Sequence, residues 1–591
     1  MSVAPRGMSV QEAYREFTAG NFRVNRQYQR KLVWSTDEKR RLIDSLLRGY
    51  PIPLILLATK SENGNKTFEI LDGLQRLNAV FSFIENAFDW EGRFFDVEQL
   101  ARAKQMSEQG RFVAETDQDR LLEERSCATL LEYTFAVTEF PATDTDAVND
   151  VFGRINAYGR QLSAQERRQA GVVSPFASCV REIASEVRGD ASASSLDLAE
   201  MPEISIDISG DEPKYGVRAD MTFWCKQGIL RKSQLRDAED EQLLADLVIS
   251  ILEEEPFGFS GRALDEYYTV GSEKFREVNV ALDRYGVDAL KNSVITVISV
   301  IREVVESQDP GANVLRRVIH PEAGGNPIKT GFYALFMAFY ELCIREGKSP
   351  FDNGAILRAL NGLQDRLQVA AGQIRSEPRA QNIAVAKGLI QRYFEEREPA
   401  VTQLGAGLAI RFENALRRSR VETAAYECKQ GILNLDASRS ANQTLLDNLV
   451  ETACGIANLG PQSHGAIFIG VADDSDAKLR IEHMDSIRAL EVGARYVVGV
   501  DRELPHLGIS LEAYKRRVVD HFAHSALSEP LKTALLGTID CIDYRGHSVL
   551  CIWVPSQRRV SDVGDIVFAR HGSSTNRVVG LRAVEAVTAR F

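Results

Sequence analysis

The spacing of hydrophobic residues changes twice along the chain, and these changes predict three regions of different structure. Near the N-terminus a short strand-like run at 67–71 precedes helical spacing that begins at residue 75. From about 220 to 400 helical spacing dominates, and residues 332–344 are almost wholly apolar, as in a buried helix. Beyond residue 421 strand-like and helical stretches alternate again. The pattern predicts a multidomain α+β protein with a helical middle and a C-terminal α/β domain.

The predicted domain boundaries follow these changes of pattern. At 591 residues the chain is too long for one core, so several domains are expected. Ser, Asp, Glu and Gly accumulate in one internal stretch, which predicts a long loop inserted in the helical region. The predicted segments are an N-terminal domain at 1–175, a mainly helical domain at 176–400 with its loop insertion at 186–216, a linker at 401–420 and a last domain at 421–591.

Composition limits the function and the location of the protein. The net charge of −12 argues against passive coating of nucleic acid, although local basic grooves stay compatible with it. Apolar runs such as 51–58 are too short to span a bilayer, and the first residues lack the apolar core of a secretory signal. The eight cysteines are scattered without a C-x-x-C pair. We therefore expect a reduced, cytoplasmic protein with no membrane contact and no structural zinc.

A turn between a predicted strand and a predicted helix is the first candidate site. The strand ends at Asp72-Gly73, so the turn presents backbone N–H groups and a helix N-terminus, which favour anions. Arg30 and Arg76 carry guanidinium groups that fit phosphate oxygens, and Gln75 can hold a water or contact a base edge. A tight turn with surface arginines would show the same spacing, so both interpretations stand at this point.

Three ordered elements resemble the ParB/sulfiredoxin-like N-terminal domain of GmrSD-type restriction enzymes, the domain of unknown function 262 family. They are Tyr28-Gln29-Arg30 with Trp34, the loop 72–76, and the run 152–166 that reads Phe-x-Arg-x-Asn-x-x-Gly-x-x-Leu-x-x-x-Glu. The resemblance covers roughly residues 10–175. Leu74 stands where the family has the first glutamine of its Asp-Gly-Gln-Gln-Arg loop, which puts hydrolysis in doubt more than binding.

This resemblance implies a sensor of foreign or modified DNA that binds a nucleotide, with or without NTP hydrolysis. The implied pocket residues are Arg30, Asp72, Gly73, Gln75, Arg76, Arg154 and Asn156.

A set of charged residues in the last domain is the second candidate site. Glu422, Glu427 and Asp473 supply oxygen ligands of the type that hard divalent cations prefer, and Lys429 adds a positive partner for phosphate. Strand alternation puts Glu427 and Lys429 on one face, whereas Glu422 is an odd number of residues away and must lie on a preceding turn or helix end. Asp473 follows an apolar run at 466–471 that predicts a central strand. Taken singly, each of these charges is typical of a solvated surface.

The order of the elements around this set resembles the Schlafen AlbA-like domain, over roughly residues 415–591. The chain contains Glu-x4-Glu-x-Lys, a helix that ends in Ala-Asn, Gly-Val-x-Asp, and a late segment from Arg570 to Thr575. The resemblance implies Mg²⁺ or Mn²⁺ at Glu422, Glu427 and Asp473, with Asp474 as the alternative third ligand. It implies phosphate stabilisation by Lys429. Many AlbA-like domains bind nucleic acid without cleaving it, so cleavage and binding alone both stay open, and a homodimer is expected on family grounds only.

Basic residues could extend such a site along a nucleic acid. Lys515, Arg516 and Arg517 lie on a predicted helix, and Arg570 belongs to the late segment; a solvated helix face is the alternative for the first three. His521 and His524 follow on the same helix, but a metal role for them requires a carboxylate that the sequence does not place. No HNH-type histidine pair and no phosphate-binding G-x4-G-K-[ST] loop occurs.

Together these features predict a prokaryotic anti-phage defence effector. The N-terminal domain would sense nucleotide or foreign DNA, and the C-terminal domain would cleave RNA or DNA with a divalent metal. The alternative is a regulator that binds nucleic acid without cleaving it, under an N-terminal NTPase or nucleotide-binding switch.

Overall fold

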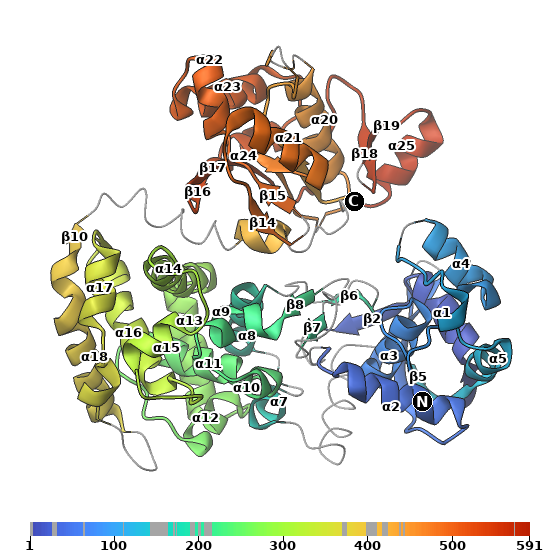
Figure 1. Ribbon diagram of the computed structural model, residues 1–591, viewed down its shortest axis with the longest axis horizontal. Helices are drawn as coiled ribbons and strands as arrows, with labels where there is room; N and C mark the ends of the chain where they lie inside the picture. Colours follow the sequence, from blue (N-terminus) through green and yellow to red (C-terminus); the bar gives the residue numbers. More distant parts are fainter. Residues whose placement is uncertain are drawn as a thin grey trace. The chain divides into compact units, whose positions relative to one another are not determined.

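The computed structural model shows two compact units, Met1–Gln403 and Leu404–Phe591 (Figure 1). It combines helices and sheets in several domains, as the α+β prediction requires, whereas the particular domain folds named above stay predictions. No described helix is both long enough and apolar enough to cross a bilayer. The structure describes residues 4–25, 32–62, 65–109, 111–141, 163–169, 172, 174–189, 195–198, 203–205, 216–368, 375–396, 411–416, 424–436, 439–440, 442, 444–461, 463–493, 495–572 and 574–591.

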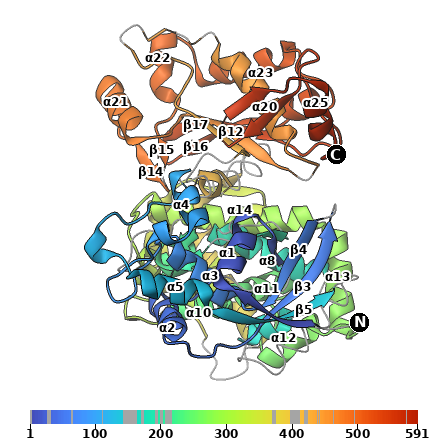
Figure 2. The ribbon, with the colours of Figure 1, turned by 90° about the vertical axis from the view of Figure 1, so that its right-hand side faces the viewer.

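A mixed six-stranded sheet forms the N-terminal part of the first unit, in the order β1-β5-β3-β4-β2-β6. Figure 2 shows β3, β4 and β5 next to one another; β3 pairs antiparallel with β4 and parallel with β5. The predicted strand at 67–71 and the helix after it are confirmed as β4 and α3. The bounds are β1 Ala4–Ser9, β2 Phe22–Asn25, β3 Ile55–Glu62, β4 Asn65–Asp72, β5 Thr134–Pro141, β6 Ser195–Asp197, α1 Val10–Thr18, α2 Thr36–Leu47, α3 Leu74–Ile84, α4 Ala101–Glu108 and α5 Glu124–Glu132.

Helix α1 illustrates how the sequence covers this sheet. Its buried residues Val10, Tyr14 and Phe17 recur at three- and four-residue intervals and so share one face. The hydroxyl of Ser9 accepts a hydrogen bond from the N–H of Glu12, which caps the helix start. Phe17 stacks on Phe81 of α3 with ring centroids 4.5 Å apart. The two helices therefore belong to one core with the sheet.

Helices make up most of the middle of the chain. The apolar helix predicted at 332–344 is confirmed as α16, which is buried from Gly331 to Tyr340. Strands β6 and β7 lie within the segment 186–216, which the sequence assigned to a loop insertion. The bounds are α7 Ala164–Gln169, α8 Pro175–Arg188, β7 Glu203–Ser205, β8 Gly216–Arg218, α9 Phe223–Lys226, α10 Lys232–Arg236, α11 Glu239–Leu252, α12 Gly261–Tyr268, α13 Glu273–Tyr285, α14 Val287–Glu306, α15 Val314–Ile319, α16 Lys329–Tyr340, β9 Lys348–Pro350, α17 Asn353–Ala359, α18 Ser376–Ile390 and β10 Phe394–Glu396.

The second unit is built on a four-stranded sheet of order β11-β12-β17-β16, in which β11 and β12 are parallel. One face packs on α20 and α23, and the other packs on the segment around Phe412. The bounds are β11 Tyr426–Lys429, α20 Leu445–Ala457, β12 Gly465–Ile469, β13 Val471–Ala472, α21 Ser475–Asp485, β14 Leu490–Val492, β15 Arg495–Val497, α22 Leu504–Leu507, α23 Leu511–His524, α24 Leu531–Leu536, β16 Ile539–Tyr544, β17 His547–Val554, β18 Phe568–His571, β19 Ser574–Arg577 and α25 Leu581–Thr588.

The strand predicted at 466–471 is divided in two by Gly470. This glycine has φ +108°, a conformation that L side chains rarely adopt, and a Cβ there would lie 3.2 Å from Ser548 O. Its N–H donates to Lys429 O at 2.8 Å, where β11 ends. The chain then leaves the sheet of β12 and enters the small sheet β13-β15-β14. Asp473 therefore lies beyond this bend and outside the ladder that holds Glu427.

Glu503 fixes the turn that follows β11. Its fully buried carboxylate accepts hydrogen bonds from the N–H groups of Ile432 and Leu433, both at 2.9 Å, and from the Tyr514 hydroxyl at 2.7 Å. A Cβ on Gly431 would lie 2.0 Å from Glu503 Oε1, so only glycine fits beside this carboxylate. One side chain thus holds the turn to α23.

We expect Glu503→Ala to lower the free energy of unfolding of the second unit by about 3–5 kcal/mol, because three buried donors lose their acceptor. Hydrogen exchange of the full chain, followed at peptides around residues 430–433, measures the effect. Glu503→Gln keeps the volume and one acceptor oxygen and should lose less. Equal exchange in wild type and Glu503→Ala would contradict this account.

Candidate nucleotide and nucleic-acid sites

The turn from Asp72 to Arg76 joins β4 to α3 as the sequence predicts. Gly73 has φ +104°, a conformation that favours glycine, and a Cβ there would lie only 3.0 Å from Ile55 Cγ1, a tight contact. The Gly73 N–H donates to Asp72 Oδ1 at 2.7 Å, and Arg76 Nη2 donates to Asp72 Oδ2 at 2.8 Å. No side chain of the described residues caps the N-terminus of α3. The first-turn N–H groups of this helix are therefore suited to an anion.

Gln75 and Arg76 hold neighbouring segments against the turn. Gln75 is buried, and its Oε1 accepts from the N–H groups of Val33 at 3.0 Å and Trp34 at 3.2 Å. Arg76 Nη1 donates to Pro53 O at 2.6 Å. These hydrogen bonds of Gln75 hold the backbone of Val33 and Trp34, which follow the Tyr28-Gln29-Arg30 element. Arg30, Arg154 and Asn156 lie outside the described residues, so their place in a pocket stays a prediction.

Glu69 is a buried carboxylate near this turn that the sequence reasoning did not select. It lies on β4, accepts from Asn25 Nδ2 at 3.1 Å and pairs with Lys60 Nζ at 2.6 Å. Burial raises the pKa of its carboxyl above the usual range, and the Asn25 hydrogen bond opposes the shift. The sequence signal was a glutamate between the apolar residues Phe68 and Ile70 of the predicted strand.

In the second unit Glu427 lies in a buried ion-pair cluster. Glu427 and Lys429 share one face of β11, as predicted, and Cys428 faces the opposite core. Glu427 Oε1 pairs with the Lys429 ammonium, and Glu427 Oε2 accepts from Arg570 Nη1 at 2.8 Å. Glu427 is only 6% exposed. Both of its oxygens therefore contact cations of the protein itself.

Arg570 closes this cluster from the hairpin β18–β19. Its side chain is fully buried, and it also donates to Thr575 Oγ1 at 3.1 Å and to Tyr426 O at 3.3 Å. The Thr575 hydroxyl lies 3.2 Å from that of Thr452 on α20. The late Arg-to-Thr segment is thus anchored on β11 and α20. Arg570 is therefore buried in contacts within the second unit, and its contact with nucleic acid stays a prediction.

Asp473 and Asp474 have different partners. Asp473 Oδ1 accepts from Arg495 Nη1 at 2.8 Å, and its side chain is about one-third exposed. Asp474 is the N-cap of α21 and accepts from the Ala477 N–H at 2.7 Å. Among the described residues no three His, Cys, Asp or Glu side chains are grouped closely enough to hold a metal ion. Glu422 lies outside the described residues, so the three-carboxylate metal site stays a prediction.

The predicted basic residues of α23 lie on its accessible side. Lys515 Nζ pairs with Asp540 at 3.0 Å and Arg516 pairs with Glu512 at 2.9 Å, whereas Arg517 is exposed. The structure also supplies the carboxylate that the sequence could not place: Asp447 of α20 lies 3.0 Å from His521 Nε2. This pair links α20 to α23.

Comparison with known families supports the N-terminal assignment. Residues 11–172 match the family described as "GmrSD restriction endonuclease, N-terminal domain". The match points to a restriction-type, anti-phage nuclease role, and it implies contact with nucleic acid. Neither the curated proteins nor the solved structures gave a match to this chain. The resemblance of the second unit to the Schlafen AlbA-like domain stays a prediction.

Gln75→Ala should lower the free energy of unfolding of the N-terminal part by about 1–3 kcal/mol, because the N–H groups of Val33 and Trp34 lose their acceptor. Urea denaturation followed by Trp fluorescence measures the loss. Gln118→Ala, which truncates an exposed glutamine of the same unit, is the matched control. A loss as large in the control as in Gln75→Ala would argue against the two hydrogen bonds as the cause.

Arg570→Ala should destabilise the second unit by about 3 kcal/mol, because the carboxylate of Glu427 stays buried with only Lys429 beside it in this cluster. Glu427→Gln in the same chain should recover part of that loss. A double-mutant cycle by thermal denaturation measures the coupling. Strictly additive effects of the two substitutions would show that the pair contributes no coupling energy.

Proposed function

We propose that this protein is a restriction-type defence effector that senses nucleotide or foreign DNA with its N-terminal domain and cleaves nucleic acid with its C-terminal unit. The observation that carries the proposal is the match of residues 11–172 to a restriction endonuclease N-terminal domain. The strand–turn–helix at Asp72–Arg76 supports nucleotide binding, because no described side chain caps the N-terminus of α3, which lies beside the Asp72–Arg76 ion pair. Leu74 at the family's glutamine position favours binding over hydrolysis.

In the C-terminal unit the cleaving residues would be Glu422, Glu427, Lys429 and Asp473. The described donors do not form a metal site alone, since Glu427 and Asp473 each pair with an arginine. A bound Mg²⁺ or Mn²⁺ would polarise the scissile phosphate and activate a water. It would require Glu422 as a further ligand. Lys429, on the same face as Glu427, would place a positive charge beside a phosphate oxygen.

A second function, binding without cleavage, is favoured by the pairing of Glu427. Its two oxygens already contact Lys429 and Arg570, so this carboxylate has a structural role without any metal. In that case Arg516 and Arg517 on the accessible side of α23 would contact the phosphate backbone. Such a protein would bind nucleic acid without cleaving it, and its N-terminal domain would control that binding.

The deciding experiment incubates the full chain with Mg²⁺ or Mn²⁺ and tRNA, single-stranded DNA or double-stranded DNA, with and without NTP. We expect metal-dependent cleavage that falls at least about a hundredfold in Glu427→Gln. Glu585→Gln, which removes an exposed carboxylate of α25, is the control and should cleave like wild type.

Cleavage by Glu427→Gln at the wild-type rate would contradict the proposal that Glu427 is an active-site residue. Tight nucleic-acid binding by wild type with no cleavage under any of these conditions would select the non-cleaving regulator instead.

A further inference from the structure

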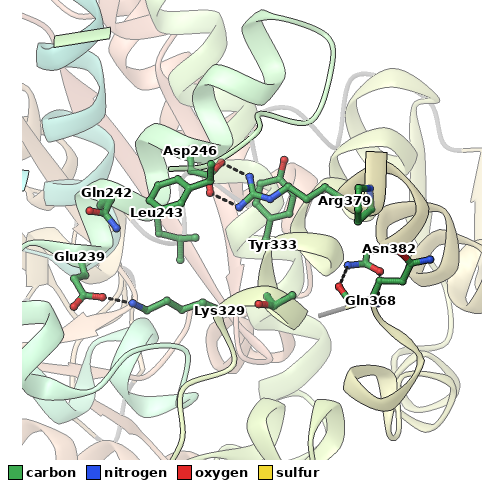
Figure 3. A pocket seen from close by; sticks show the side chains of 12 residues that line it. Glu239, Gln242, Leu243, Asp246, Lys329, Tyr333, Gln368, Arg379 and Asn382 are labelled. Atoms are coloured by element: carbon green, nitrogen blue, oxygen red, sulfur yellow. Dashed lines mark hydrogen bonds and ion pairs between the residues drawn. The ribbon is translucent and has the colours of Figure 1, made fainter. Parts of the chain in front are cut away.

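A pocket of about 160 Å³ lies among α11, α16 and α18 in the helical part of the first unit (Figure 3). A dry cavity of about 150 Å³ holds a benzene molecule, so this space accommodates one planar ring system. The pocket lies in sequence beyond residue 172, where the family match ends. None of its lining residues belongs to the candidate sites described above.

The closed end of the pocket is a buried ion pair. Arg379 of α18 donates to both carboxylate oxygens of Asp246 at 2.6 and 2.7 Å and to Phe257 O at 2.8 Å. Its guanidinium lies 3.9 Å from the centroid of the Tyr333 ring. The Asp246 and Arg379 side chains are 5% and 9% exposed. Burial raises the pKa of Asp246, and Arg379 opposes the shift. This end is neutral as a pair and is held rigidly by several contacts.

The open end of the pocket is a second ion pair, between Glu239 of α11 and Lys329 of α16. These side chains are 28% and 35% exposed, several times more than the first pair. Figure 3 shows the two pairs on opposite sides of the pocket. All four charges of the pocket are already paired with one another. An ionic ligand would therefore lose its hydration on entering the pocket and find no unpaired opposite charge to compensate the loss. The pocket is therefore suited to an uncharged ligand.

Two of the lining residues each carry a hydrogen-bonding group that has no partner in the described part of the chain. Gln242 Oε1 accepts from Arg168 Nη1 at 3.0 Å, while its Nε2 group has no partner among the described residues. The Thr330 hydroxyl likewise has no partner in the described part of the chain. Asn382, in contrast, already exchanges two hydrogen bonds with the backbone of Gln368. The donors left for a ligand are therefore on α11 and α16.

Apolar surfaces complete the lining. Leu243 of α11 and Pro378 of α18 contribute aliphatic surface, and Phe259 contributes an aromatic ring. A ligand that satisfies all of these features is flat, uncharged, apolar on its faces and able to donate and accept hydrogen bonds at its edge.

We propose that this pocket binds a free nucleobase or the base of a free nucleoside. The ring would lie against Leu243 and Pro378, and its edge would meet the Gln242 amide and the Thr330 hydroxyl. A ribose would extend past Glu239 and Lys329 at the open end. This site is independent of the proposed nuclease and of the nucleotide turn at Asp72, so it adds a small-molecule input to the helical middle of the chain.

Isothermal titration of the full chain with adenosine, guanosine, cytidine, uridine and their free bases tests the proposal. At least one should bind at concentrations up to about 1 mM. Thr330→Phe fills the pocket and should weaken that binding about tenfold or more, whereas Thr330→Ser keeps the hydroxyl and should change it by less than about threefold. Binding of the base alone would place the recognition in the pocket; binding of the nucleoside alone would require the sugar contact at the open end.

Gln242→Glu is the second variant, because it preserves an acceptor for Arg168 and removes the amide donor; we expect about tenfold weaker binding. If circular dichroism shows that Thr330→Phe does not fold, the binding measured with Gln242→Glu tests the proposal instead. Absence of binding by every nucleoside and base would overturn the proposal. Equal binding by wild type, Thr330→Phe and Gln242→Glu would also overturn it, because the ligand would then occupy another site.

Discussion

Glu427 is a carboxylate on a buried strand, and the architecture of the second unit depends on how its charge is compensated. A charged group that leaves water loses several kcal/mol of solvation unless an opposite charge and hydrogen bonds replace the water. Lys429 supplies one partner from the same strand, and Arg570 supplies the other from the hairpin β18–β19. Because Arg570 also contacts Thr575 and the backbone of Tyr426, compensation of one charge fastens the last hairpin to β11.

The same requirement shapes the helical middle of the chain. Asp246 and Arg379 are buried against each other, and the pairing fixes α11 to α18. Buried pairs of this kind contribute little net stability compared with apolar packing of similar volume. Their contribution is geometric, since bidentate contacts define the relative position of two helices. The pocket beside this pair owes its shape to that constraint.

A carboxylate that is paired with a cation of the protein is less available to bind a metal ion. A carboxylate that already contacts two cations can hold a protein segment, but it must exchange at least one of them to bind a metal. Glu427 and Asp473 both have arginine partners, on different elements of the second unit. Under the proposed function, cleavage by this unit would therefore require exchange of these arginine partners, and the presence of the carboxylates alone would not be sufficient.

The sequence by itself determined the local elements and the N-terminal family. Periodicity was sufficient for β4, α3 and α16, because the hydrophobic spacing of each is set by its own residues. The ordered motifs were sufficient for the restriction-type domain, which the family match at 11–172 supports. The shared face of Glu427 and Lys429 also followed from strand alternation alone.

Only the tertiary structure decided which charges meet. Arg570 lies 143 residues from Glu427 in the chain, and no local pattern specifies that contact. Gly470 has a positive φ and bends the chain after β12, so the chain leading to Asp473 enters a different sheet. The sequence did not indicate this bend, because residues 466–471 form a continuous apolar run. The pocket likewise needs three helices separated in sequence. Spacing along the chain specifies which residues share a face, whereas long-range packing specifies what that face contacts.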